Sequence, residues 1–361
     1  MPRHHALRYG NNPHQHLASF AAPPGVMDVL NGVPSYINIL DILTGWQMTR
    51  DVSSLTGMPA AVSMKHCVPV GLATPGPIDA FSCALLGAGE VDPTTSAYLR
   101  ARSSDWGAAY GDVAVIFGEV TEELATIMAR FVSDGIAATA YTKDAARILS
   151  QKRNGRYLVV KLDREYVPPT EESREILGVR LTQQCNDYLP SAADFQVVVG
   201  SEEIARRSMP DLMLSAAAMK YTVSNNIVIA SSGRTLSISA GQQSRILSTK
   251  LACFKFKQLM RLQHSDIVDI VKSSRGKLTD RILQAVGRAS DIGEVTLEGN
   301  SLIVMASDGF IPFKDNIEEA NRHGVDVIWE PQGGMRRKDV EQAAADHGMT
   351  LIRTQNRFFY H

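Results

Sequence analysis

Two short signatures occur twice in this chain, in the same order and at comparable separation. AAVSMKHCVPVG at 60–71 is matched by SAAAMKYTVSNN at 215–226, and FVSDGI at 131–136 is matched by MASDGF at 305–310. Either pair alone is weak support, but two pairs in one order favour a duplicated unit over accident. We therefore predict that the chain folds as two related subdomains.

Each half alternates segments typical of helices with segments typical of buried strands. The runs at 60–65 and 213–220 are rich in small residues and Met, which favours helices. The β-branched stretch at 226–239 is interrupted by Ser-Gly and predicts a hairpin. Buried strands are predicted over 112–119 and 157–163, with a helix over 121–131 between them. This alternation indicates an α/β fold with mixed sheets.

The most probable boundary between the two units is VPPTEES at 167–173, because two prolines and several charges interrupt the periodicity there. We expect a first subdomain over residues 1–168 and a second over residues 169–361. A polar helical stretch at about 256–290 is harder to place, and packing on the first subdomain is one option.

The charge balance argues against a polyanionic partner. The chain has 37 basic and 38 acidic residues, so we expect neither nucleic-acid nor membrane binding. No segment reaches the roughly 20 apolar residues of a membrane span, and the first residues lack the apolar core of a secretion signal. Four cysteines without a CxxC pair are typical of reduced thiols. We expect a cytoplasmic protein without a cysteine-based metal site.

Lys65 and His66 are the first candidates for chemistry. They precede Val-Pro-Val-Gly, so we expect a helix-to-loop junction at which both side chains can line one cleft. Histidine can accept a proton near neutral pH, and lysine can donate to developing negative charge. On the dipeptide alone, a surface lysine and a core histidine are the more common outcome.

Further candidates lie in loops. Arg8 and Tyr9 belong to a Gly-, Asn- and Pro-rich segment and can hydrogen-bond a phosphate, although an ordinary N-terminal arm is the alternative. Phe310 and Pro312 offer flat apolar groups that can hold a heteroaromatic ring, or that belong to the core. Asp134 can pair with donors on a ring or cap a turn. No GxxxxGK[ST] motif occurs, which argues against an ATP-driven ligase of that class.

These segments together resemble a known family. The motifs are LRYGNNPHQ, LNGVPSYINILD, MKHCVPVG, YGD, VSDGI, KYTVSNN, AGQQSRI, SDGFIPFKDN and NRFFYH, and their order is that of the AICAR transformylase domain of bifunctional purine-biosynthesis enzymes. The resemblance runs from Leu7 to His361. It implies a tandem pair of cytidine-deaminase-like α/β subdomains in a homodimer with active sites between subunits.

The implied reaction is transfer of a formyl group from 10-formyltetrahydrofolate to the amine of 5-aminoimidazole-4-carboxamide ribonucleotide (AICAR), which gives the formamido product (FAICAR) and tetrahydrofolate. Relatives also carry a cyclohydrolase domain that closes the purine ring. This sequence begins almost directly at LRYGNNPHQ, so we expect transformylase activity alone, with ring closure by a separate protein. Folate is then a cosubstrate, and no metal is required.

The resemblance also assigns roles to individual positions. The catalytic residues it implies are Lys65, His66 and Asn225. Those implied to bind AICAR are Arg8, Tyr9, Lys65, Asn225, Phe310 and Arg357. Those implied to bind the folate are Tyr110, Gly111, Asp134, Arg245, Ile246 and Pro312. Tyr110 stands where relatives often have Phe, and Ile311 replaces a common second Phe.

Two other functions make different demands on the sequence. A zinc deaminase shares the implied fold but needs HxE and PCxxC motifs, which this sequence lacks. A non-catalytic nucleotide- or folate-binding relative stays open as the alternative. That reading predicts loss of Lys65, His66 or Asn225, and all three are present.

Overall fold

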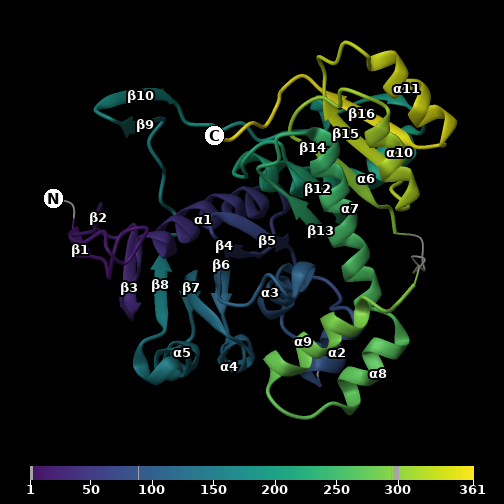
Figure 1. The fold of residues 1–361 in the computed structure, drawn as a ribbon. Helices are drawn as coiled ribbons and strands as arrows, with labels where there is room; N and C mark the ends of the chain where they lie inside the picture. The colour runs from purple at the N-terminus through teal and green to yellow at the C-terminus, as the bar shows by residue number, and fades with distance from the viewer. Residues whose placement is uncertain (1–2, 88, 294, 296–300) are drawn as a thin grey trace.

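The computed structural model describes residues 3–87, 89–293, 295 and 301–361. Within these ranges, the strands of both halves form one 12-stranded sheet in the order β11-β16-β15-β14-β12-β13-β5-β4-β6-β7-β8-β3 (Figure 1). The first half contributes β3 (Met27–Asn31), α1 (Tyr36–Thr56), β4 (Ala60–Lys65), β5 (Val68–Ala73), α2 (Ala80–Leu86), α3 (Pro93–Arg102), β6 (Asp112–Val120), α4 (Glu122–Arg130), β7 (Ser133–Tyr141), α5 (Lys143–Gly155) and β8 (Leu158–Leu162). The second half contributes β11 (Gln196–Val199), α6 (Glu202–Lys220), β12 (Ile227–Ser231), β13 (Arg234–Ser239), α7 (Arg245–Leu262), α8 (Ser265–Ser273), α9 (Leu278–Ala289), β14 (Val304–Ser307), α10 (Asp315–Arg322), β15 (Val327–Pro331), α11 (Arg337–Asp346) and β16 (Thr350–Thr354).

The two halves of the sheet have the same topology. In the first, β5 and β4 form an antiparallel hairpin, β4 pairs antiparallel with β6, β6-β7-β8 run parallel, and β3 closes the edge antiparallel. In the second, β13, β12, β14, β15, β16 and β11 repeat these pairings in the same order. A long helix, α1 or α6, precedes each hairpin. The predicted α/β fold of tandem duplicated subdomains with mixed sheets is confirmed.

The repeated signatures nevertheless lie at different points of the two repeats. The run at 60–65 is strand β4 and not the predicted helix, whereas 215–220 is the end of α6. The second signature leads into the start of strand β7 in the first half but overlaps the end of β14 in the second. Strand β4 lies between β5 and β6 and is almost wholly buried. Burial in a central strand therefore overrides the helix propensity of its Ala and Met residues.

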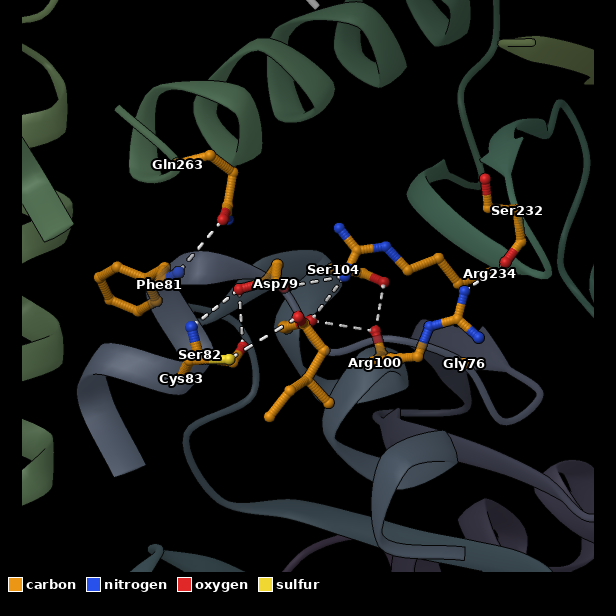
Figure 2. A network of polar contacts seen from close by, with 12 residues as sticks. Gly76, Asp79, Phe81, Ser82, Cys83, Arg100, Ser104, Ser232, Arg234 and Gln263 are labelled. Carbon is orange, nitrogen blue, oxygen red and sulfur yellow. Dashed lines mark hydrogen bonds and ion pairs between the residues drawn. The ribbon is translucent and has the colours of Figure 1, made fainter. Parts of the chain in front are cut away.

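Buried charges fix the seam between the half-sheets, where β5 pairs with β13. Figure 2 shows the network: the Arg234 guanidinium pairs with the Asp79 carboxylate at 2.9 Å. Arg100 donates to the backbone carbonyls of Thr74 and Ser232, one from each half. The Arg234 and Asp79 side chains are only 10% and 11% exposed, so removing one of them would leave the other unpaired at a cost of about 3–5 kcal/mol.

Helices cover both faces of the sheet. α1 and α6 pack against each other on one face and share a hydrophobic core that spans the two halves. On the other face, a core under α3, α4 and α5 serves the first half, and a core under α7, α10 and α11 serves the second. Helices α8 and α9 of the stretch at about 256–290 pack beside α2 and add apolar side chains to the first-half core (Figure 1). No helix in the described ranges is both long and apolar enough to cross a membrane.

Two small antiparallel pairs lie outside the main sheet. β1 (Arg3–Ala6) pairs with β2 (Ser19–Ala22) near the N-terminus. β9 (Glu171–Ile176) pairs with β10 (Val179–Gln184) in a hairpin that projects from the body (Figure 1). Every residue of these last two strands is exposed. The segment 167–173 leads into this hairpin, and its role as a subdomain boundary stays a prediction.

Candidate active site

Lys65 and His66 lie at the hairpin turn between β4 and β5. His66 and Cys67 are the two central residues of this turn, with φ of 54° and 61°. Two successive left-handed residues match the twist of a two-residue hairpin, but they are unfavourable for residues other than Gly, Asn or Asp. The amide of Cys67 donates to the Asp41 carboxylate at 2.6 Å, which holds the turn in place. The imidazole of His66 is therefore presented at the tip of a fixed turn, exposed to solvent.

The Lys65 ammonium connects this turn to the next predicted element of the site. Its Nζ donates to the backbone carbonyl of Ala108 at 3.1 Å and to that of Tyr110 at 2.7 Å. The Tyr110 ring is 52% exposed. Gly111 follows with φ of 76° and donates its amide to Val132, so a left-handed turn aims the Tyr110 segment. An ammonium has three N–H groups, so Lys65 keeps one for a ligand.

Asp134 is the second residue of strand β7, and it lies at the same end of the sheet's strands as Lys65. Its carboxylate pairs with Arg153 at 2.9 Å, and both side chains are nearly half exposed. Arg153 comes from the left-handed end of α5, directly after Lys152. The Lys152 ammonium donates to Ser133 Oγ at 2.6 Å and to the Met128 carbonyl. Burial lowers the pKa of Lys152 to about 7, and its hydrogen bond to the Ser133 hydroxyl holds the residue that precedes Asp134.

Asp41 is a site residue that the sequence patterns do not identify, although it ends one of the motifs, LNGVPSYINILD at 30–41. It lies on α1 and is only 4% exposed. Burial raises its pKa to about 6, the amide of Cys67 lowers it, and the charge of Asp134 raises it further. The hydrogen bond from the Cys67 amide groups Asp41 with the Lys65–His66 turn.

The N-terminal loop lies against the beginning of α1. Arg8 Nη2 is 3.4 Å from the Asn38 side-chain oxygen, and the Tyr9 carbonyl accepts from the Tyr36 amide. Asn38 and Asp41 belong to the same end of that helix. The structure therefore brings Arg8 and Tyr9 to the end of α1 that supports the His66 turn.

The second-half candidates surround the start of α7. Asn225 donates from its amide and from Nδ2 to the Gln242 carbonyl, at 3.1 and 2.8 Å. Ile246 is half-buried on the first turn of α7, and Pro312 is half-buried in the loop after β14. Phe310, from that loop, is 45% exposed. The ring of Phe310 is thus available to a ligand on the second-half side.

Arg245 has a different environment from the other candidates. Its guanidinium is buried and donates to the Asp308 carboxylate and to the Asn226 carbonyl. The side chain thereby fixes the loop that carries Phe310. A direct contact between Arg245 and folate stays a prediction.

The C-terminal segment lies against the Asn225 region. The Ser224 amide donates to the Tyr360 carbonyl, and the Phe358 amide donates to the Asp308 carbonyl at 2.9 Å. The Tyr360 ring also packs edge-on against Tyr221, with ring centroids 6.5 Å apart. Burial raises the pKa of the Tyr360 phenol, and the charge of Glu172 raises it further. The exposed Arg357 guanidinium stacks over the Phe359 ring, 4.5 Å from its centroid.

Two clefts lie away from these residues. One of about 400 Å³ opens between the end of α1, α6 and the β12–β13 turn, and it is lined by Asp211 and Ser232 among others. A second of about 610 Å³ lies beside β11 and β16, near Arg353. None of the sequence-predicted site residues lines either cleft. Among the described residues, no group of three or more His, Cys, Asp or Glu is arranged to hold a metal.

Comparison with known proteins assigns the chain to a family. The model of the AICARFT/IMPCHase bienzyme family matches residues 1–255. The bifunctional purine biosynthesis protein PurH of Synechococcus sp. (strain WH7803) is 28% identical over 378 aligned residues, which cover 100% of this chain and 60% of that protein. PurH of Oenococcus oeni (strain ATCC BAA-331 / PSU-1) is 29% identical over 362, which cover 98% of this chain and 60% of that protein. The chain thus spans 60% of the length of these relatives, and it belongs to the AICARFT/IMPCHase bienzyme family.

Proposed function

We propose that this chain transfers the formyl group of 10-formyltetrahydrofolate to the amine of AICAR, giving FAICAR and tetrahydrofolate. Membership of the bienzyme family supports a role in purine biosynthesis. The observation that carries the formyl-transfer assignment is the 2.7 Å hydrogen bond from Lys65 Nζ to the Tyr110 carbonyl. It joins the proposed catalytic pair to the segment proposed to hold the pterin.

The proposed mechanism begins with orientation. The amine of AICAR is a poor nucleophile because its lone pair is delocalised into the ring and the carboxamide. Holding it against the formyl carbon can lower the barrier by roughly 7–11 kcal/mol in favourable cases. The Arg8 and Arg357 guanidinium groups are exposed and suited to the phosphate, while the Phe310 ring offers a flat surface to the imidazole.

Bond formation then requires a base and an oxyanion partner. The amine nitrogen attacks the formyl carbon, the new C–N bond forms, and His66 accepts the amine proton directly or through the carboxamide. The formyl oxygen becomes an oxyanion, and Lys65 and Asn225 are the proposed donors to it. The bond from carbon to the folate N10 breaks as the carbonyl reforms, and N10 takes a proton from Lys65 or from water.

The proposed pterin pocket is built around Asp134. A carboxylate can accept two parallel hydrogen bonds, which matches the paired ring donors of a pterin. The exposed Tyr110 ring supplies a flat apolar surface nearby. The Asp134–Arg153 pair is partly exposed, so its opening for a ligand costs on the order of 1 kcal/mol or less.

We also infer that the enzyme acts as a homodimer, for which the β9–β10 hairpin is the main support. All three apolar residues of the two strands, Ile176, Val179 and Leu181, lie on one face, here called the apolar face, which also carries Arg174, Glu172 and Gln183. The opposite face is wholly polar, with Ser173 opposite Thr182. Isolated two-stranded hairpins are marginally stable in water. Burial of the apolar face against a second copy would remove this exposed surface and stabilise the hairpin.

A coupled spectrophotometric assay tests the proposed function. Purified protein, AICAR and 10-formyltetrahydrofolate are expected to yield tetrahydrofolate and FAICAR without inosine monophosphate. Binding of both ligands without tetrahydrofolate formation would instead support a non-catalytic relative. Formation of inosine monophosphate would contradict the expected absence of cyclohydrolase activity.

A further inference from the structure

The loop after β14 is held by hydrogen bonds at its start, on the N-terminal side of the residues that it presents. This loop, SDGFIPF at 307–313, carries Phe310 and Pro312. At its start, the Asp308 carboxylate accepts from the Asn226 amide at 3.2 Å and from the Arg245 guanidinium. Asp308 itself is fully buried. The first anchor is therefore a carboxylate that belongs to the loop.

A second anchor holds the loop from outside, just after Phe310. The Ile311 amide donates to Glu330 Oε2 at 2.6 Å. Glu330 lies on β15 and is 2% exposed. Its other oxygen accepts two hydrogen bonds from Arg353 of β16, at 2.9 and 2.8 Å. Arg353 also pairs with Glu341 of α11. Glu330 is thereby fixed by a two-pronged ion pair, and its free oxygen is directed at the loop.

Between the anchors, Phe310 is the residue that reaches solvent. One side of its ring lies against Gly333 and Gly334, where an added Cβ would be 3.6 and 3.5 Å from ring atoms. The other anchored residue, Ile311, is 1% exposed and packs into the second-half core. The position of the Phe310 ring therefore depends on where the Ile311 backbone is held.

We propose that Glu330, held by Arg353, is a positioning residue that sets the ligand-facing conformation of the Phe310 loop. This inference rests on the proposed function for the identity of the ligand, but not for the loop geometry. Without the carboxylate, the buried Ile311 amide loses its acceptor, and the loop can recover a partner only by moving toward water. Neither Glu330 nor Arg353 belongs to the motifs that the sequence singles out.

Three variants separate positioning from general stability. Glu330→Ala removes the acceptor for Ile311, and Glu330→Gln keeps an oxygen acceptor without the charge. Glu341→Gln is the matched control, because it weakens the Arg353 network but leaves the Ile311 hydrogen bond intact. Amide hydrogen exchange of the segment 308–313 reads the loop directly. We expect exchange at Ile311 to accelerate about tenfold or more in Glu330→Ala, and to stay near wild type in Glu341→Gln and Glu330→Gln.

Ligand binding tests whether the loop matters to the site. Calorimetric titration with AICAR is expected to show about tenfold weaker binding for Glu330→Ala, with recovery in Glu330→Gln. Equal exchange and equal AICAR affinity in wild type and Glu330→Ala would overturn the proposal. If Glu330→Ala does not fold, Glu330→Asp takes its place, because the shorter side chain withdraws the carboxylate from the Ile311 amide; faster exchange at Ile311 than in Glu341→Gln then supports the proposal, and equal rates overturn it. Failure of the proposed function appears separately, as wild-type protein that does not form tetrahydrofolate.

Discussion

The amide nitrogen of Cys67 lies 2.6 Å from a carboxylate oxygen of Asp41, a residue 26 positions earlier in the chain. This hydrogen bond connects helix α1 to the β4–β5 turn, in which His66 and Cys67 both have left-handed backbone conformations. Asp41 is buried, so the carboxylate is enclosed beside the turn that presents the proposed base. Its protonation state should therefore affect both the stability of the fold and the position of His66.

The first prediction concerns pH. Burial raises the pKa of Asp41 to about 6 in the folded state, above the value of an unfolded chain. Protonated Asp41 thus contributes stability at low pH, and that contribution is lost as the pH rises through about 6. Between about pH 5 and pH 7.5 the loss amounts to roughly 1 kcal/mol. The Asp41→Asn variant has no titrating group at this position. The difference between its free energy of unfolding and that of wild type should therefore increase by roughly 1 kcal/mol from about pH 5 to about pH 7.5. Urea unfolding at both pH values measures it.

The matched control for this measurement is Asp144→Asn. Asp144 is paired with Arg147 and is 59% exposed, so its variant should follow the wild-type pH dependence. Parallel pH curves for wild type and Asp41→Asn would show that Asp41 is not the titrating group.

The second prediction concerns the proposed base. His66→Ala should lower kcat by about 100-fold or more, because it removes the group proposed to accept the amine proton. His347→Ala is the control, since His347 is an exposed residue after α11. Steady-state kinetics with AICAR varied at saturating folate measures the effect. An unchanged kcat in His66→Ala would remove this residue from the role.

The third prediction concerns folate recognition. Asp134→Asn replaces an acceptor of two hydrogen bonds by a group with one acceptor, so KM for 10-formyltetrahydrofolate should rise about tenfold or more. Arg153→Gln should change that KM much less, because a half-exposed ion pair contributes about 0–1 kcal/mol. KM for AICAR should be nearly unaffected in both variants. An equal rise for the two substrates would point to general damage and not to a pterin contact.

Much of the fold could be predicted from the sequence, because burial on both faces leaves a plain pattern. Strand β6 contains the continuous apolar run VAVIF at 113–117, and the hairpin at 227–239 has a Ser-Gly turn. The duplication was predicted correctly, but from signatures that do not occupy equivalent places. Ala and Met in 60–65 favour a helix locally, and only their position between two strands makes the segment β4.

The site was less predictable, because its geometry depends on distant partners. The segment Lys-His-Cys-Val contains no Gly or Asn, so nothing local indicates a tight hairpin turn at His66. The acceptor that supports it, Asp41, comes from a helix. Glu330 likewise acts on Ile311 from a neighbouring strand. A buried acidic residue within an apolar strand or helix is the signal that sequence reasoning could use to find such partners.

The last prediction concerns assembly. Leu181 and Thr182 are neighbours on β10 but face opposite sides of the hairpin. If a second copy covers the apolar face, Leu181→Lys places an unpaired charge in that interface and should shift the protein from dimer to monomer. Thr182→Lys adds the same charge to the polar face and should stay dimeric. Light scattering after size-exclusion chromatography at several concentrations gives the mass of each variant. A wild-type monomer, or equal dissociation by the two substitutions, would show that the apolar face of β9–β10 is not the dimer contact.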